Sequence, residues 1–458
     1  MFQPIRVMDF ITHETMLCAG VGLLLGGIDD LVVDLIFIVQ RLCRGPAARP
    51  TLATLPISPA RLRLAVFVGA WDESAVIGAM LANAVARFDH DDYRIYVGVY
   101  PNDRATIDAA AAVATRDPRI RLVIGTRDGP TTKADCLNTV WHAMQREDAA
   151  RGRPTDAIVL HDAEDLVHGG ELRVFDALLR THAVVQIPVL PLVARGSPLV
   201  SGHYADEFSE AHAKTIVVRT ALGAGMPLAG TGCAISVPML ESIAGQRSGD
   251  PFDADSLTED YELGLRIAEL GGRATFARVR DEDGALVAVR AFFPATIDAA
   301  VRQKARWLTG IALAGWDRTG WSRAAAIGDH WMRMRDRRAP LAMLVLAIAY
   351  GALVCWGADG ALRWGLGEPG VAMHPSWLIA VNTALLIWRI GSRMAFTGAA
   401  YGWREALWAA PRFVVGNYIA LLAARRALFR YVAMLRGAPT VWDKTVHAFP
   451  AELVAEGR

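Results

Sequence analysis

Short apolar runs alternate with longer amphipathic patterns between about residues 60 and 165. Four of the runs have the length of buried strands: 64–70, 93–100, 120–125 and 157–160. The segments between them carry the helical period, and they run to about Arg87, follow Asp103 and open at Lys133. Because strands that alternate with helices build parallel sheets, the pattern predicts an α/β fold with parallel strands.

Polar side chains follow each predicted strand at the point where the strand ends. The loop 71–73 (Trp-Asp-Glu) follows the first strand, Asp103 follows the second, and KADCLN, which begins at Lys133, follows the third. The fourth strand ends in HDAED, residues 161–165. Ligands of open α/β sheets bind at the carboxyl ends of the strands. The sequence therefore predicts a binding site at this edge of the sheet.

The HDAED run places two carboxylates where they can reach one ligand. Asp162 and Glu164 are two residues apart at a strand end, and they would repel each other without a cation nearby. Mg²⁺ is typically held by one or two carboxylates plus phosphate oxygens. We therefore predict a clamp for a metal-bound diphosphate, with a solvated loop tip or a helix N-cap as the alternative. Asp165 is expected to start or cap the segment that follows.

Three other apolar runs approach the length of about 20 residues that a membrane-spanning helix needs. They cover residues 16–40, 339–358 and 369–388. Three carboxylates that are costly against lipid interrupt the first run: Asp29, Asp30 and Asp34. The simpler interpretation packs this acidic face on a neighbour, and the alternative is a functional acidic lining. The first run lacks the basic leader and cleavage site of a signal peptide, so we expect it to be retained.

The arginines that flank these runs indicate how the chain is divided. Arginines follow the first run and precede the second, so they border the region between residues 50 and 335 on both sides. Basic flanks are typical of the cytoplasmic side of a membrane. The run 413–424 is short for a span, so an interfacial or re-entrant helix fits it, with a fourth span as the alternative. The expected division is an N-terminal transmembrane helix and linker (1–50), a cytoplasmic domain (51–335) with interfacial helices near 297–335, transmembrane or interfacial helices (336–430) and a cytoplasmic tail (431–458).

Composition agrees with a membrane-embedded part joined to a soluble part. Apolar residues make up 53% of the chain and charged residues 21%. The 48 basic and 47 acidic residues leave a net charge of +1, so no bulk positive field exists to attract nucleic acid. The five cysteines are scattered without metal-ligand spacing, which is typical of reduced thiols.

Three further motifs follow HDAED in order: the small-residue loop GTGC at 230–233, TED at 258–260 and QKARW at 303–307. With the strand-end Asp103 and the DxE of HDAED, this set resembles the processive, cellulose-synthase-like branch of the inverting family-two glycosyltransferases. More narrowly, HDAED, LAGTGCAIS, LTEDYELG, QKARWLTGIALAGW and WDKTVHAFP are similar to the bacterial inner-membrane exopolysaccharide glycosyltransferases known as phage adsorption protein B. The resemblance runs over nearly the whole chain.

The resemblance implies a Rossmann-like, GT-A type domain that binds a nucleotide sugar, with a mixed, mostly parallel sheet, beside an α-helical transmembrane region. It also implies a divalent cation, Mg²⁺ or Mn²⁺. The chain ends at Arg458, just after WDKTVHAFP. We therefore expect the C-terminal regulatory domain of longer members, and direct second-messenger control with it, to be absent.

The resemblance also implies roles for the donor half of the site. Asp103 would hold the base or ribose, and Trp71 and Glu73 would line the same pocket. Asp162 would bind ribose and metal. Glu164, which stands where many relatives have aspartate, would still ligate the metal through its carboxylate.

The resemblance places the catalytic group in the later motifs. Asp260, with Glu259 beside it, would be the general base that takes a proton from the acceptor hydroxyl as that oxygen attacks the anomeric carbon with inversion. Gln303 and Arg306 would stabilise the departing UDP. Lys133 would contact phosphate, and a surface lysine at a helix start is its alternative.

The resemblance assigns the acceptor to one loop and one aromatic side chain. Trp307 would stack on the acceptor sugar. The loop residues implied to line the acceptor site are Gly230, Thr231, Gly232 and Cys233. Each motif also has a structural alternative: a plain turn for the loop, an N-cap at Thr258 for TED, and a membrane-surface helix for QKARW.

The resulting expectation is a multi-pass enzyme of the bacterial inner membrane with a cytoplasmic catalytic domain. It would move a sugar from a UDP-sugar to a growing envelope or secreted polysaccharide. Transfer of a single sugar to a lipid-linked acceptor and a non-catalytic membrane scaffold are the alternatives. The expected partners are the sugar donor, the acceptor, the lipid bilayer and an outer-membrane or periplasmic export protein, with no nucleic acid.

Overall fold

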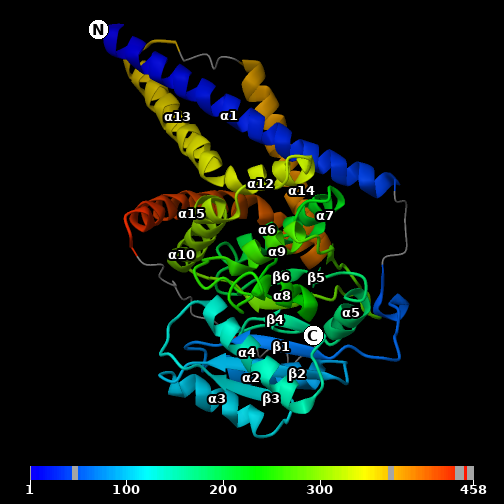
Figure 1. Ribbon diagram of the computed structural model, residues 1–458. Coiled ribbons are helices and arrows are strands. Elements are labelled where there is room, and N and C mark those ends of the chain that lie inside the picture. The colour runs from blue at the N-terminus through cyan, green and yellow to red at the C-terminus, as the bar shows by residue number, and fades with distance from the viewer. Residues whose placement is uncertain (1, 44–49, 370–375, 439–447, 451–458) are drawn as a thin grey trace.

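The structure is a computed structural model that describes residues 2–43, 50–369, 376–438 and 448–450. Most of the predicted tail 431–458, including most of WDKTVHAFP, lies outside the described residues. Figure 1 shows a sheet domain at one end of the molecule and long helices that project away from it at the other end.

The four predicted strands form one half of a seven-stranded sheet. The strand order is β3 (Ile120–Ile124), β2 (Tyr93–Val99), β1 (Leu64–Gly69), β4 (Ala157–His161), β7 (Cys233–Ser236), β5 (Val184–Gln186) and β8 (Ala274–Phe276). The first four run parallel, as predicted, so their carboxyl ends meet at one edge. Only β7 runs against its neighbours β4 and β5, which makes the sheet mixed and mostly parallel.

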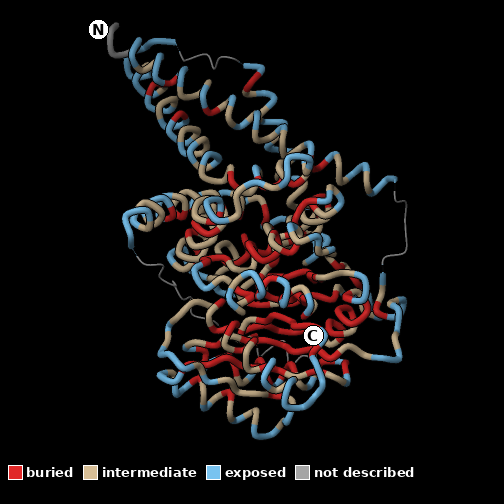
Figure 2. Tube along the Cα trace, viewed as in Figure 1, coloured by how far each residue is buried: buried red, intermediate tan, exposed pale blue. Residues whose placement is uncertain are grey.

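Two helical layers cover the sheet because its strands are apolar on both faces. Successive residues of β1 point to opposite faces of the sheet: Val66 packs in one core cluster and Phe67 in the other. The first layer contains α2 (Ile77–Arg87), α3 (Arg104–Ala114) and α5 (Glu171–Leu178). The second contains α4 (Lys133–Arg151), α8 (Val237–Ala244) and α9 (Glu259–Glu269). Burial is concentrated in this sandwich, as Figure 2 shows.

A second, two-stranded sheet stands between the sandwich and the long helices. It pairs β6 (Val189–Leu192) with β9 (Val289–Phe292) in parallel. Helix α6 (Gly202–Glu210) follows β6 and continues through the π-turn Ala211–Thr215 into α7 (Ile216–Ala221). Helix α10 (Ile297–Leu308) follows β9, then the π-turn Thr309–Leu313, α11 (Ala314–Thr319) and α12 (Ile327–Arg337).

Four long helices complete the described part of the chain: α1 (Phe2–Cys43), α13 (Ala339–Leu366), α14 (Ser376–Tyr401) and α15 (Trp403–Leu435). Helix α1 packs along α13 and α14, and the pair α1 and α13 extends away from the sheet domain (Figure 1). Helix α15 packs instead on α10, α14 and α6.

The aspartates of the first apolar run pair with basic residues of neighbouring elements. Asp30 contacts Arg335 and Arg338, which flank the end of α12, and Arg389 of α14. Asp29 binds the same two α12-end arginines, and Asp34 pairs with Lys214 of the π-turn after α6. The simpler interpretation of this acidic face, packing on neighbours, is therefore confirmed.

Two of the described helices, α13 and α15, are long and apolar enough to cross a membrane by length and composition. The predicted span 16–40 falls within α1, and residues 376–388 of the span 369–388 fall within α14, while 370–375 lie outside the described residues. That these segments cross a membrane stays a prediction. The run 413–424 is not a short helix of its own, because it is continuous with the rest of α15.

Candidate active site

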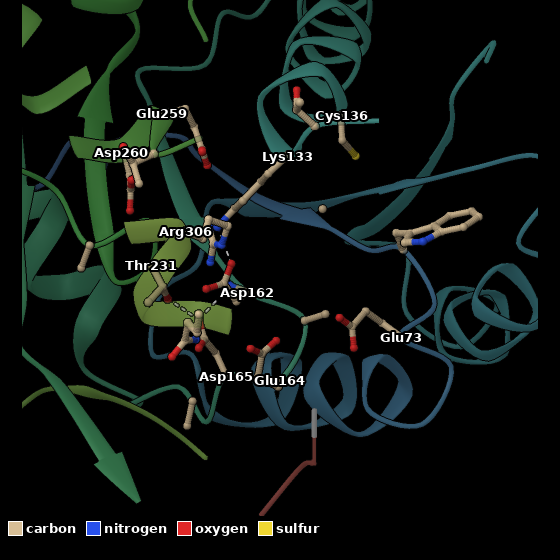
Figure 3. Close-up of a pocket in the computed structure, with 18 of the residues that line it drawn as sticks. Glu73, Lys133, Cys136, Asp162, Glu164, Asp165, Thr231, Glu259, Asp260 and Arg306 are labelled. Atoms are coloured by element: carbon tan, nitrogen blue, oxygen red, sulfur yellow. Dashed lines mark hydrogen bonds and ion pairs between the residues drawn. The ribbon is translucent and has the colours of Figure 1, made fainter. Parts of the chain in front are cut away.

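A cavity of about 200 Å³ opens where the carboxyl ends of β1 and β4 meet α9 and α10. Figure 3 shows charged side chains from all of these segments pointing toward it. The predicted residues that line it are Trp71, Glu73, Lys133, Asp162, Glu164, Thr231, Glu259, Asp260, Gln303, Arg306 and Trp307. The fold therefore brings together residues from motifs that are far apart in the sequence.

The loop after β4 is held by a buried ionic network. His161 is fully buried, and its Nδ1 lies 2.8 Å from Asp165 Oδ2 while its Nε2 lies 2.7 Å from Glu171 Oε1. Burial alone would lower the pKa of His161, but the Glu171 and Asp165 carboxylates outweigh it and raise the pKa to about 10. The imidazolium form can donate from both nitrogens, so one positive charge is shared between two carboxylates.

The prediction that Asp165 starts or caps the segment that follows is wrong. Its carboxylate accepts hydrogen bonds from the Asp162 backbone N–H at 2.9 Å and from the Thr231 hydroxyl. The next helix begins only at Glu171, with Gly170 as its N-cap. The sequence-based interpretation missed this role because Thr231, more than sixty residues away, supplies one of the partners.

Lys133 stands at the first turn of α4 and faces the DxE loop. Its ammonium forms an ion pair with Asp162 and donates to the Gly230 carbonyl at 3.0 Å. Burial opposes its charge, but the carboxylates of Asp162 and Glu259 keep the pKa of Lys133 above its ordinary value. The alternative of a solvated surface lysine is therefore wrong, because this cation lies among the acids of the cavity (Figure 3).

Glu259 and Asp260 enter the cavity from the first turn of α9. Burial and the adjacent Asp260 charge raise the pKa of Glu259 to about 7. Burial also raises the pKa of Asp260, although the Lys133 cation opposes this. Thr258 precedes the helix as its N-cap residue, but its side chain makes no capping hydrogen bond. Helix capping alone thus does not account for the TED motif.

Gly230 allows the small-residue loop to approach Asp260 closely. Its φ of +73° lies in the left-handed region, and a Cβ added there would lie 2.7 Å from Asp260 Oδ2. Gly232 also has a positive φ, +59°, and packs against Val289 of β9. The loop is therefore more than a plain turn, since it sets the space beside the proposed base.

Helix α10 carries two polar groups with unused hydrogen-bonding capacity. Arg306 donates from Nη1 to the Leu257 carbonyl at 3.3 Å, but its Nε is buried and has no partner. Gln303 Oε1 and Thr258 Oγ1 are also buried without a hydrogen-bond partner. Buried polar atoms normally have a hydrogen-bond partner, so these three atoms in the cavity wall can bind a polar ligand or water.

Aromatic side chains form the wall nearest the long helices. Trp307 packs with Phe208 of α6 and with Phe293 just after β9, at ring-centroid distances of 6.3 and 6.5 Å. All three line the cavity. Of these three residues only Trp307 was predicted from its motif. The AFF run at 291–293 was a signal for Phe293, whereas Phe208 reaches this wall only through the fold.

Four predicted residues lie outside the cavity lining. Asp103 caps α3 through Thr106 N and also accepts from Asp72 N at 2.5 Å, so it fixes the loop that presents Trp71. Cys233 is fully buried in β7, and Gly230 and Gly232 contribute backbone only near the site. The predicted contacts of these four with nucleotide or acceptor stay predictions.

The carboxylates of the DxE loop fit a divalent cation as part of its ligand set. Asp162 and Glu164 offer oxygen atoms only, the donor type that Mg²⁺ and Mn²⁺ prefer. No group of three or more potential metal ligands occurs among the described residues. A cation held here would therefore need oxygens from a bound diphosphate or water to complete its coordination.

Comparison with known proteins identifies relatives over most of the chain. Bacteriophage adsorption protein B of Escherichia coli K12 and bacteriophage N4 adsorption protein B of Escherichia coli O157:H7 are each 33% identical over 464 residues. The match covers 94% of this chain but only 61% of the relatives, so the chain spans about three fifths of their length.

The fold also matches a solved structure. A mannosyltransferase from Pyrobaculum calidifontis, in complex with GDP-Man and Mn²⁺, aligns over 88% of this chain and 98% of its own with a TM-score of 0.51 and 17% identity. At that identity the match supports the GT-A type fold alone. A sequence model described as glycosyltransferase-like family 2 matches residues 59–310, which hold every charged cavity residue described above. The chain therefore belongs to glycosyltransferase family 2.

Proposed function

We propose that this protein is a membrane-bound, inverting glycosyltransferase that moves a sugar from a UDP-sugar to a growing envelope or secreted polysaccharide. The observation that carries the proposal is the cavity at the β1 and β4 ends. There the carboxylates of the DxE loop face a cation, Lys133, and an acid pair on α9. One pocket thus offers groups for a diphosphate and a base for a hydroxyl.

Asp260 acts as the general base in this proposal. The acceptor oxygen forms a bond to the anomeric carbon while the bond from that carbon to the diphosphate oxygen breaks. The acceptor proton passes to Asp260, whose burial raises its pKa and so favours holding a proton. Gly230 leaves room beside the carboxylate for the approaching hydroxyl.

The departing UDP gains negative charge that Lys133, Gln303 and Arg306 stabilise. The unpartnered Arg306 Nε and the side-chain N–H groups of Gln303 supply donors on this wall, and the Lys133 ammonium faces the DxE loop. A divalent cation held by Asp162 and Glu164 would neutralise the diphosphate as it leaves. Trp71 and Glu73, with Asp103 behind their loop, are proposed to hold the nucleoside.

The acceptor side is proposed to bind a sugar ring against Trp307. Phe208 and Phe293 extend this apolar wall, and carbohydrate rings bind by stacking an apolar face on aromatic side chains. The polar edge of the acceptor would then face Thr231 and Asp260.

We propose that residues 51–335 form a cytoplasmic catalytic domain and that the helices on either side of it lie in the bacterial inner membrane. The paired aspartates and arginines of α1, α12 and α14 support a single unit of helices and domain. An export partner in the envelope would receive a polymer product.

The test is a screen of UDP-sugars for UDP release and sugar incorporation by membranes that contain this protein. One UDP-sugar should support incorporation, and EDTA should abolish it until Mg²⁺ or Mn²⁺ is restored. Products that extend to long chains on a carbohydrate gel support polymer synthesis, whereas a single lipid-linked sugar overturns it. No incorporation with any donor would favour a non-catalytic scaffold.

A further inference from the structure

Helix α10 faces the cavity with one side and α6 with the next. Gln303, Arg306 and Trp307 line the cavity. Lys304 reaches α6 instead, where its ammonium donates to both carboxylate oxygens of Glu207, at 2.8 and 2.6 Å. Residues three apart lie on the same side of a helix, so Lys304 and Trp307 share the side of α10 that meets α6.

The side of α6 that binds Lys304 also contacts Trp307. Tyr204 stands one turn before Glu207 and is fully buried, and its ring lies edge-on to Trp307 with 6.1 Å between the ring centroids. The Lys304 ammonium lies 5.2 Å from the centroid of the same Tyr204 ring, within the range of a cation–π contact. Phe208, next to Glu207, packs on the Trp307 ring as well. One face of α6 therefore holds both the cation and the indole of α10.

The pair of Lys304 with Glu207 is shielded from water and joins two elements. Their side chains are 13% and 32% exposed. Burial opposes the charge of Glu207, but the Lys304 ammonium holds the pKa of its carboxyl down at about 2. By contrast, Asp298 and Arg302 form a pair within α10, and the Asp298 side chain is 72% exposed. Loss of one partner from a buried pair leaves an uncompensated charge, whereas an exposed pair contributes little.

Helix α6 can hold α10 because its other acids are anchored to the long helices. Asp206 is buried and pairs with Arg412 of α15 at 3.2 Å. Glu210 pairs with Arg393 of α14 at 3.0 Å. Glu207 lies between these two acids in the sequence and binds α10. The position of the QKARW motif is thereby tied to α14 and α15.

We propose that Lys304 and Glu207 are positioning residues for sugar transfer, because their pair holds α10 against α6 with Arg306 and Trp307 facing the cavity. The inference rests on the proposed function, which assigns Arg306 to the leaving diphosphate and Trp307 to the acceptor sugar. Lys304 thus acts through its neighbours on α10 and not by contact with phosphate.

Hydrogen exchange of the full chain in detergent micelles tests the holding role without a substrate. Lys304→Met keeps the apolar stem and removes the charge, and Glu207→Gln removes the other charge at nearly equal size. The backbone amides of α10 should exchange at least about 10-fold faster in both variants than in the parent, because local opening becomes easier. The matched control, Arg302→Gln, removes the cation of the exposed pair on the same helix and should exchange within about 3-fold of the parent. Parent-like exchange of α10 in both variants would overturn the proposal.

Initial rates of sugar incorporation, with the UDP-sugar that the screen identifies, test the consequence for transfer. Lys304→Met and Glu207→Gln should each lower the rate by about 10- to 100-fold, since displacement of a catalytic group by about 1 Å has a cost of that order. The combined variant should lose no more than the slower single variant, because the two side chains act as a unit. Lys304→Arg keeps the charge and can donate two hydrogen bonds to Glu207, so it should recover most of the rate.

Three outcomes separate positioning from general damage. UDP affinity should stay within a few-fold of the parent in every variant, because the proposed nucleoside contacts lie at other strand ends. An equal loss of UDP affinity and rate would overturn the positioning role, and so would a Lys304→Arg rate as low as that of Lys304→Met. Single losses that multiply in the combined variant would show that the two residues act separately and would overturn it as well.

A failure of the proposed function would look different. The parent itself would then incorporate no sugar from any UDP-sugar. The exchange comparison would still decide whether the pair holds α10, because it requires no turnover.

Discussion

His161 shows how one side chain organises the proposed metal loop. Its single positive charge is shared by Asp165 and Glu171 in a fully buried site, and Asp165 in turn accepts hydrogen bonds from the Asp162 backbone N–H and the Thr231 hydroxyl. Sequence analysis could predict the carboxylates of HDAED from their place at a strand end. The HDAED pattern does not show that one of them, Asp165, faces inward, because one of its partners, Thr231, comes from a distant segment.

Replacing His161 should therefore destabilise the domain. His161→Phe leaves two buried carboxylates without their cation, which costs about 3–5 kcal/mol of unfolding free energy. The matched control is His142→Phe, which removes a half-exposed histidine paired with Asp250 at 2.7 Å and should cost under about 1 kcal/mol. Thermal unfolding of the purified full chain measures both. Equal losses in the two variants would mean that the buried network contributes little.

Substitution of Gly230 tests whether sugar transfer needs the space beside the Asp260 carboxylate. Gly230→Ala adds a Cβ that would lie 2.7 Å from Asp260 Oδ2, so the carboxylate must move. A shift of about 1 Å in a catalytic group can cost on the order of 100-fold in rate, and we expect a loss of that order in sugar transfer. Initial rates with the identified donor measure it.

The control for this variant is Gly284→Ala. Gly284 has a similar left-handed backbone, φ +81°, but open space around a Cβ. The Gly284→Ala variant should bear the same backbone strain as Gly230→Ala and keep the parent's activity. An equal loss at both glycines would show that backbone strain, and not contact with Asp260, controls the rate.

Among the elements, the long buried strands were predictable and the short ones were not. β1 and β4 show as continuous apolar runs that end in polar residues, which is typical of strands buried on both faces. β5 and β8 are three residues long and β6 and β9 four, so only their pairing partners make them strands. The sequence therefore offered only the AFF run at 291–293 as a signal for the wall built by β6, β9 and α6.

The joint between α6 and β6 should make stability depend on pH. His212 is buried in the π-turn, where its Nδ1 accepts from Val189 N at 3.0 Å, and burial lowers its pKa to about 4. Its stabilising contribution is present above the unfolded pKa of about 6.5 and is lost as pH falls toward 4, because the unfolded chain then binds the extra proton. The full loss is about 3 kcal/mol.

Chemical denaturation of the full chain between pH 7 and 4 measures this dependence. His212→Asn keeps an acceptor for Val189 N without a titrating ring, so its stability should vary less with pH than that of the parent. Parallel pH profiles for parent and variant would rule out His212 as the source of the dependence.

The molecule joins a part built from the first four strands, which we propose to bind the donor, to later segments that contact the long helices, which we propose to bind the acceptor. Four motifs in order were enough to predict the family, and residues from these motifs line the cavity. The arrangement of the long helices was less predictable, since α15 depends on contacts with α6 and α10 that no local pattern encodes. The cavity lies at the junction of the two halves.

The assignment of Asp260 as the base that removes the acceptor proton is tested by Asp260→Asn, with Asp283→Asn in an exposed loop as the matched control. The measurement is the initial rate of sugar incorporation together with UDP affinity. We expect Asp260→Asn to lower the rate by at least about 100-fold while UDP affinity stays within a few-fold of the parent, and Asp283→Asn to match the parent in both. An Asp260→Asn rate equal to that of the parent would contradict the proposed mechanism.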